Sequence, residues 1–225
     1  MSVPEHHTAL AAVLFEMLAE RSLDCYGGNT QGVRSGDVVL DCGANVGVFV
    51  REALDAGARL VIASEPSPEN LACLQRNFRN EVAGGRVIVC DRGLWHEDTV
   101  LSLGLSESPA GDSFIQDNHP RTPGPKLRVT TIDNLVSELK LDRLDFIKMD
   151  IEGAERNALN GAAKTLSACR PRLAISAYHL SDDPIVLTRI VNEFRPNSQR
   201  TATQGRMLYG GLLHSRIAPL VLFFK

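Results

Sequence analysis

The chain has 225 residues, of which 44% are hydrophobic and 23% charged, and its formal net charge at pH 7 is −3. This length and composition suit one globular α/β domain with a full-sized core. Nucleic-acid binding usually depends on a basic excess or a basic stripe, and the sequence shows neither, so we expect no nucleic-acid partner.

The five cysteines are scattered and form no C-x-x-C pair, which is typical of free thiols in a reducing compartment. Residues Met1–His7 lack the basic and apolar segments of a signal peptide. No apolar run approaches the ~20 residues that cross a bilayer. We therefore expect a cytoplasmic protein without a membrane span.

The first predicted element in chain order is an N-terminal helical segment over residues 1–35. Within it, the apolar residues of Thr8–Glu20 have helical spacing. From Asp37 onward, short apolar runs alternate with helical patterns up to residue 225. The predicted strands are Val38–Leu40, Leu60–Ala63, Arg86–Cys90, Leu127–Thr130, Leu144–Met149, Arg172–Ala177 and Leu220–Phe224. The predicted helices are Val46–Ala56, Ser67–Arg79, Ile132–Leu139, Glu152–Ala168 and Pro184–Phe194. This alternation predicts one α/β domain over residues 36–225, with a mainly parallel seven-stranded sheet and helices on both faces.

The alternation lapses between Gly104 and Lys126, where the sequence is rich in proline and glycine. A loop of this length in a compact domain is usually functional or disordered. We expect it to cover the substrate site and to become ordered on binding.

A glycine loop, Asp41–Gly47, lies at the first predicted junction from strand to helix, where glycines let the backbone approach a ligand. A dinucleotide-binding loop needs G-x-G-x-x-G, but Asn45 occupies the place of the middle glycine. The carboxylate of Asp41 would repel a pyrophosphate and favour a sulfonium and an amino group. We therefore predict that Asp41, Gly43, Asn45 and Gly47 bind S-adenosylmethionine rather than NAD.

Two further acids follow the next two strands. Glu65 lies about 20 residues after the loop, where a carboxylate can accept hydrogen bonds from both ribose hydroxyls. Its alternative role is that of an exposed turn residue before Pro66. Asp91 follows the third strand and, with Gly93, could frame the adenine ring, although an aspartate at a strand end is as often a turn residue.

A second acidic motif, Phe146–Glu155, ends another buried strand. Ligands of open α/β sheets bind at the carboxyl ends of the strands, so Asp150 should face the same crevice as Asp41. Glu152 could instead begin the following helix, where a carboxylate suits the helix dipole.

Four blocks in this order resemble the FkbM-type methyltransferase family: DCGANVG at Asp41–Gly47, EPSPEN at Glu65–Asn70, TIDNL at Thr131–Leu135 and IKMDIEGAE at Ile147–Glu155. The similarity covers roughly residues 36–179. It implies a Rossmann-like class I methyltransferase fold with an antiparallel last strand. It also implies S-adenosylmethionine as methyl donor, S-adenosylhomocysteine as product and usually a hydroxyl as acceptor.

The chain departs from many members of that family after the strand Leu173–Ala177, where those members carry a glutamate. Here the chain continues with Tyr178 and His179, followed by Asp182 and Asp183, and so resembles a branch with a Tyr-His pair.

Methyl transfer to a hydroxyl requires an aligned acceptor and a base that takes its proton. His179 is the first candidate for this base, because it follows a strand and titrates near neutrality. Asp150 is the second, either as base or as acceptor for the amino group of the cofactor, and His214 is a third. Asp150, Glu152 and His179 could also converge on Mg²⁺, but their spacing does not require it, so we expect no metal.

The sequence thus predicts O-methylation of a hydroxyl on a small molecule, a sugar or a glycan terminus. One alternative is a cofactor-binding module of the same fold without turnover. Another is an NAD-dependent oxidoreductase, against which the missing middle glycine and Asp41 argue. The oligomeric state is left open.

Overall fold

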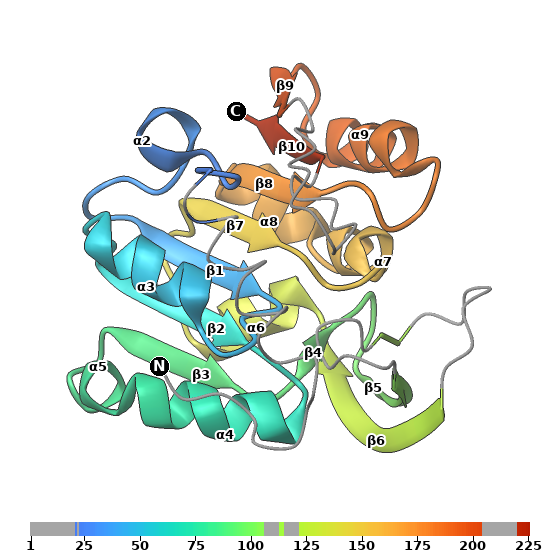
Figure 1. Cartoon of the computed structure of the whole chain (residues 1–225). Helices are drawn as coiled ribbons and strands as arrows, with labels where there is room; N and C mark the ends of the chain where they lie inside the picture. The colour runs from blue at the N-terminus through green and yellow to red at the C-terminus, as the bar shows by residue number, and fades with distance from the viewer. Residues whose placement is uncertain (1–20, 22, 106–112, 115–121, 204–219) are drawn as a thin grey trace, which may run out of the picture.

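A seven-stranded sheet forms the centre of the molecule (Figure 1). The computed structural model describes residue 21 and residues 23–105, 113–114, 122–203 and 220–225. The sheet order is β3 (Val87–Cys90), β2 (Leu60–Ser64), β1 (Val38–Cys42), β7 (Phe146–Met149), β8 (Arg172–Ser176), β10 (Val221–Phe224) and β9 (Arg200–Ala202). Neighbours from β3 to β8 are parallel, whereas β10 is antiparallel to both of its neighbours. The predicted fold class, a mainly parallel sheet with an antiparallel last strand, is confirmed.

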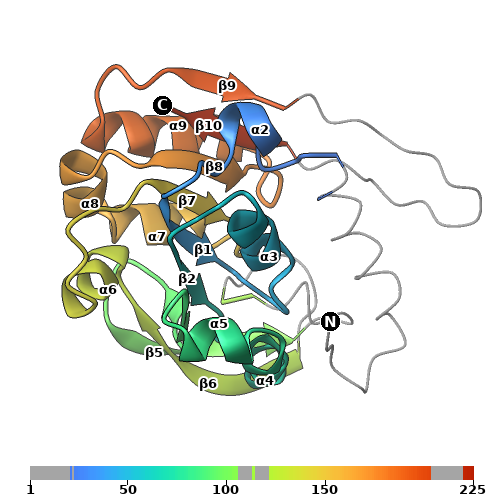
Figure 2. The same ribbon diagram turned by 90° about the vertical axis from the view of Figure 1, so that its left-hand side faces the viewer.

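Helices cover both faces of this sheet. Figure 2 shows α6 (Ile132–Glu138), α7 (Glu155–Asn160), α8 (Ala163–Ala168) and α9 (Asp183–Phe194) on one side and α3 (Val48–Asp55) on the other. Successive side chains of a strand point to opposite faces, so neighbouring strand residues belong to different cores. Leu40 packs in the core under α6 to α9, whereas Val39 packs with Phe49 of α3.

Three further helices are described, α2 (Gly28–Gln31), α4 (Pro68–Asn77) and α5 (Arg79–Ala83). Leu74 of α4 packs in the same core as Phe49 of α3. The predicted helix Ser67–Arg79 thus corresponds to α4 and the start of α5, with a break at Phe78.

The predicted helix Glu152–Ala168 is wrong as one continuous element. Glu152 and Gly153 have φ of 54° and 92°, so the chain turns here and α7 begins only at Glu155. A second interruption comes at Gly161, where a Cβ atom would lie 2.2 Å from the carbonyl oxygen of Trp95. The backbone therefore passes too close to its neighbour for α7 and α8 to be joined by an ordinary residue.

A second sheet, which the sequence did not predict, consists of β4 (Gly93–Leu94), β6 (Thr122–Thr130) and β5 (Thr99–Leu105) in that order. The predicted loop 104–126 is therefore too long at both ends. The prolines of β6 lie in its first part, where β5 is its partner, while β4 joins only at Val129 and Thr130. Proline is tolerated in a strand that is paired on one side.

The carboxyl ends of the central strands lie level with one another. Cys42 of β1 pairs in register with Ser64 of β2 and Met149 of β7, and Met149 pairs with Ile175 of β8. The segments that follow these strands therefore leave the sheet at one edge, where ligands of such folds bind. Among the described helices, none is long and apolar enough to cross a membrane. The predicted helix Thr8–Glu20 lies outside the described residues, and the division into an N-terminal segment and one domain stays a prediction.

Candidate functional site

The glycine loop after β1 adopts a backbone that requires glycine at two positions. Gly43 and Gly47 have φ of 78° and 95°. A Cβ atom on Gly43 would lie 2.1 Å from the carbonyl oxygen of Asp150, and one on Gly47 would lie 2.1 Å from the ring of Phe78. The loop is thus pressed against the end of β7 on one side and against the end of α4 on the other.

A pocket opens beside this loop at the carboxyl edge of the sheet. Its lining comes from the segments after β1, β2, β7 and β8, and from the second sheet. The lining includes Gly43, Asn45, Glu52, Glu65, Gly93, Ser113, Phe114, Lys148, Asp150, Glu152 and Tyr178. Residues that are far apart in the sequence therefore share one concave site.

Glu65 is buried at the end of β2 and accepts two backbone hydrogen bonds. Its carboxylate oxygens accept from the amides of Asn45 and Ser67, each at 2.8 Å. Burial raises the pKa of Glu65 to about 7, although these hydrogen bonds oppose the rise. Because each carboxylate oxygen can accept more than one hydrogen bond, Glu65 retains capacity for a ligand.

Asp41 and Lys148 form a buried ion pair beneath the loop. The Nζ atom of Lys148 lies 3.2 Å from Oδ1 of Asp41, which is fully buried, and it donates to the carbonyl oxygen of Gly43 at 2.9 Å. Burial raises the pKa of Asp41 to about 6, and the ammonium of Lys148 opposes this rise. Asp41 therefore supports the loop from below and is not among the lining residues.

Asp150 lines the pocket and is held by two tyrosines. The hydroxyl of Tyr26 donates to Oδ2 at 2.7 Å, and that of Tyr178 donates to Oδ1 at 3.3 Å. Burial alone would raise the pKa of Asp150, but the charges of Lys148 and His179 and the hydrogen bonds lower it below its usual value. Asp150 is therefore an anion at neutral pH.

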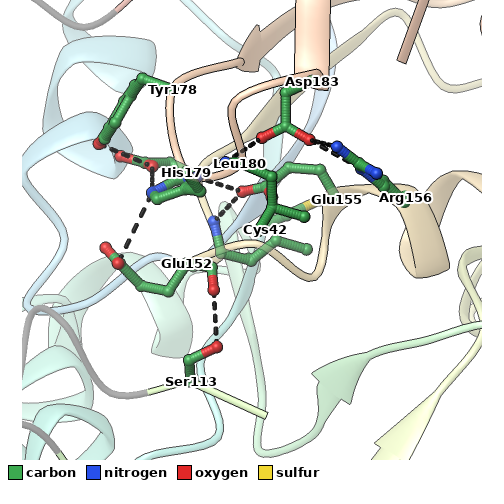
Figure 3. Close-up of polar contacts among 12 residues, drawn as sticks. Cys42, Ser113, Glu152, Glu155, Arg156, Tyr178, His179, Leu180 and Asp183 are labelled. Atoms are coloured by element: carbon green, nitrogen blue, oxygen red, sulfur yellow. Dashed lines mark hydrogen bonds and ion pairs between the residues drawn. The ribbon is translucent and has the colours of Figure 1, made fainter. Parts of the chain in front are cut away.

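His179 lies among the carboxylates of Asp150, Glu152 and Glu155, and Figure 3 labels the last two. Its Nε2 atom is 3.5 Å from Asp150 and 3.6 Å from Glu152, and its Nδ1 atom is 3.2 Å from Glu155. Burial would lower the pKa of His179, but the three carboxylates outweigh it and raise the pKa to about 11. The ring does not line the pocket.

The charges around the pocket are mostly negative. Among the lining residues, Lys148 and Arg21 are the cations, and each forms an ion pair with a carboxylate that is not part of the lining, Asp41 and Asp55 respectively. The acidic lining residues are Glu52, Glu65, Asp150 and Glu152. Burial raises the pKa of Glu52 to about 7, which is the behaviour of a carboxyl group short of compensating positive charge.

Residues 41–195 match the family described as the methyltransferase FkbM domain, and this match spans more than half of the chain. The chain belongs to this family. The matched residues begin at Asp41 and extend past His179, so they include every residue of the pocket edge formed by β1, β2, β7 and β8.

Individual relatives of the chain are methyltransferases by name. The 31-O-demethyl-FK506 methyltransferase FkbM of Streptomyces tacrolimicus is 26% identical over 61% of this chain and 64% of its own length. The hexuronic acid methyltransferase AglP of Haloferax volcanii is 26% identical over 73% of this chain and 65% of its own. The crystal structure of methyltransferase FkbM from Methylobacillus flagellatus KT has 27% identity and a TM-score of 0.63, and covers 84% of this chain but 44% of that one. The chain thus spans less than two thirds of the length of each.

The FkbM domain brings most of the predicted site residues together. Five of them line the pocket: Gly43, Asn45, Glu65, Gly93 and Asp150. Three support it from behind, namely Asp41, Gly47 and His179. Asp91 lies apart from the pocket lining, where it accepts a hydrogen bond from Arg128 at 2.8 Å, and this favours its alternative role as a turn residue. His214 lies outside the described residues.

Several lining residues had no role in the sequence analysis. Tyr26 had no predicted role, yet its hydroxyl donates a hydrogen bond to Asp150. Lys148 lies in β7, within the motif Phe146–Glu155, and a lysine inside a strand predicted to be buried was the signal for a function. Glu52 lies one helical turn into α3 and carried no local signal.

The loop that was predicted to cover the substrate site lies in part within the described residues. The backbone of Ser113 pairs with Gly104 of β5, and the hydroxyl of Ser113 donates to the carbonyl oxygen of Glu152 at 2.6 Å. The ring of Phe114 packs against Gly93, where a Cβ atom would lie 2.6 Å from it. These two residues of the predicted loop therefore do reach the pocket.

Proposed function

We propose that this chain is an S-adenosylmethionine-dependent methyltransferase that transfers a methyl group to a hydroxyl oxygen of a small molecule, a sugar or a glycan terminus. The observation that carries the proposal is the acidic pocket at the glycine loop after β1. Membership of the methyltransferase FkbM domain family supports the reaction class.

The charge of the pocket suits this donor. S-adenosylmethionine has a sulfonium, an amino group and one carboxylate, so its net charge is positive, whereas the pyrophosphate of NAD is negative. The acidic lining of Glu52, Glu65, Asp150 and Glu152 favours the cation. The same charges count against the NAD-dependent oxidoreductase.

Within this pocket each group would have its own task. Glu65 would accept hydrogen bonds from the ribose hydroxyls, as its place at the end of β2 suggests. Asp150, which is ionised and held by two tyrosines, would bind the amino group of the methionine part. Gly93 and Phe114 would line the adenine side.

When bound, S-adenosylmethionine supplies an electrophilic methyl group on a sulfur that keeps the electron pair as the bond to carbon breaks. The chain's residues have to align the acceptor oxygen and take up its proton. The sequence offers His179 and Asp150 as candidates for the base. Because His179 does not line the pocket and Asp150 is assigned to the amino group, we assign the contact with the acceptor to Glu152 and a positioning role to His179.

The acceptor class is inferred from the relatives. One relative is named for 31-O-demethyl-FK506 and another for hexuronic acid, and both names point to oxygen-rich small molecules or sugars. Because the chain covers under two thirds of these proteins, its acceptor is proposed only as a class. The cytoplasmic location and the lack of a nucleic-acid partner stay predictions from the sequence.

Calorimetric titration of the purified chain with S-adenosylhomocysteine, and separately with NAD, tests the donor. We expect saturable binding of the first and none of the second. NAD binding without S-adenosylhomocysteine binding would refute the proposal. If S-adenosylhomocysteine binds but no hydroxyl acceptor from a panel of sugars and polyketides is methylated, the alternative of a binding module without turnover gains support.

A further inference from the structure

Glu52 lines the pocket, but the proposed function gives it no task. It lies in α3 at helical spacing from Val48 and Phe49, which line the pocket as well, so the three side chains share one face of the helix. The helix begins directly after the glycine loop and runs beside β1 (Figure 1). Glu52 is therefore held at the pocket by a regular element that packs on the sheet.

The carboxylate of Glu52 has no compensating partner. It is partly buried, and within the described part of the chain it has neither a hydrogen bond nor an ion pair. The cations whose charge reaches it are Arg21 and Lys148, and these are paired with Asp55 and Asp41. Withdrawing a charged group from water without a partner costs free energy, so this carboxylate indicates a group that a ligand supplies.

The electrostatic setting of Glu52 favours a cation as that group. Burial raises the pKa of Glu52 to about 7, Arg21 and Lys148 oppose the rise, and Asp24 and Asp41 add to it. The ionised form is thus disfavoured in the empty pocket. A positive charge bound beside the carboxylate would stabilise that form again.

Tyr26 connects this part of α3 with Asp150. Its ring lies edge-on to Phe49, one helical turn before Glu52, with 5.6 Å between the ring centroids. Its hydroxyl donates to Asp150 at 2.7 Å, and the Nζ atom of Lys148 lies 5.3 Å from its ring centroid. Glu52 therefore belongs to the end of the pocket at which Asp150 is assigned to the amino group.

We propose that Glu52, together with Asp150, binds the ammonium group of the methionine part of S-adenosylmethionine. This inference rests on the proposed function. An ammonium has three donors and no acceptor, so two carboxylates can each accept one of its hydrogen bonds. Hydrogen bonds between charged groups are about twice as strong as those between neutral groups. Glu52 thus makes the pocket selective for ligands that carry the amino acid part.

One substitution should therefore have opposite effects on stability and on binding. Glu52→Gln removes an uncompensated carboxylate, so the urea midpoint of the ligand-free chain should rise at pH 8. The pKa of Glu52 is about 7 in the folded chain and 4.5 when unfolded. Its contribution to stability is present below pH 4.5 and is lost as the pH rises through 7, so at pH 5 the two midpoints should lie closer together.

The test is calorimetric titration of the full chain at pH 8 with two ligands. S-adenosylhomocysteine carries the amino acid part, whereas methylthioadenosine has the same adenosine and sulfur without it. Glu52→Gln should weaken the binding of S-adenosylhomocysteine by about tenfold or more and leave that of methylthioadenosine unchanged. The matched control is Glu193→Gln, which removes an exposed carboxylate from α9, away from the pocket lining, and should change neither affinity.

Equal affinity of the parent and of Glu52→Gln for S-adenosylhomocysteine would overturn the proposal and leave the donor unaffected. Equal weakening of both ligands would also overturn it, because Glu52 would then act on the pocket as a whole and not on the amino group. If the parent binds neither ligand, the proposed donor is wrong, and the role of Glu52 falls with it.

Discussion

At the scale of single residues, Lys148 compensates a fully buried carboxylate, that of Asp41. We expect Lys148→Met to lower the free energy of unfolding by about 3 kcal/mol at pH 8, since Asp41 would lose its partner. Urea unfolding followed by circular dichroism measures this loss. Lys164→Met, at an exposed position of α8, is the control and should change little.

The loss in Lys148→Met should depend on pH. The pKa of Asp41 is about 6 in the folded chain, above its unfolded value of 3.8. Its contribution to stability is therefore present below pH 3.8 and is lost as the pH rises through 6. Without Lys148 the pKa rises further, so the variant should lose less at pH 5 than at pH 8. An equal loss at both pH values would contradict this account of the ion pair.

Glu65 gives a second residue-scale prediction. Glu65→Ala should weaken S-adenosylhomocysteine binding by at least about tenfold, the size of a lost hydrogen bond to a charged group. Because the pKa of Glu65 is about 7, the affinity of the parent should rise between pH 6 and pH 8 as the carboxylate forms. Calorimetry should show a smaller rise in the variant.

The control for this experiment is Glu69→Ala, which removes an exposed carboxylate from the first turn of α4. It should keep both the affinity and the pH dependence of the parent. If Glu65→Ala binds S-adenosylhomocysteine as tightly as the control does, then Glu65 does not hold the ribose.

At the scale of elements, the loop after β1 depends on its glycines. In Gly43→Ala the new Cβ atom would meet the carbonyl oxygen of Asp150, at a φ of 78°. We expect a loss of about 2–4 kcal/mol in the free energy of unfolding. Gly85→Ala is a matched control, because Gly85 has a φ of 70° and nothing within 4 Å of its Cβ position. It should cost only about 1 kcal/mol.

Unfolding in urea compares the two variants directly, and calorimetry shows whether the loop still binds S-adenosylhomocysteine. Similar losses of stability in both variants would mean that backbone conformation alone requires glycine at position 43. The close approach of the loop to β7 would then have no energetic weight.

The elements that the sequence predicted correctly are those with a strong local pattern. Buried strands such as β1 and β7 are short apolar runs, and α9 has helical spacing with a proline in its first turn. Of the second sheet, only the end of β6 was predicted, as the strand Leu127–Thr130. The rest was missed because β5 is only partly buried and the first part of β6 is largely exposed. The break before α7 depends on the φ of Glu152, which no local pattern shows.

At the scale of the whole molecule, the position of the site followed from topology. Parallel strands end at one edge, so Asp41, Glu65 and Asp150 could be placed together from the sequence. The environment of each of these carboxylates could not be predicted from the sequence. Whether Asp41 lies in the pocket or beneath it, and whether Tyr26 reaches Asp150, depends on packing between distant segments.

For His179, too, the position could be predicted from the sequence but the environment could not. The sequence identified it as a histidine at a strand end, which suggested a base that titrates near neutrality. The fold surrounds it with Asp150, Glu152 and Glu155, and these carboxylates raise its pKa far above neutrality. Neighbours on three segments, which the sequence could not bring together, therefore decide its chemistry.

The most direct test of the central claim is a crystal structure of the chain with S-adenosylhomocysteine. We predict the ribose hydroxyls within hydrogen-bonding distance of Glu65, the amino group at Asp150 and the ligand against the loop at Gly43. A ligand bound elsewhere, or one whose ribose lies away from Glu65, would contradict the account.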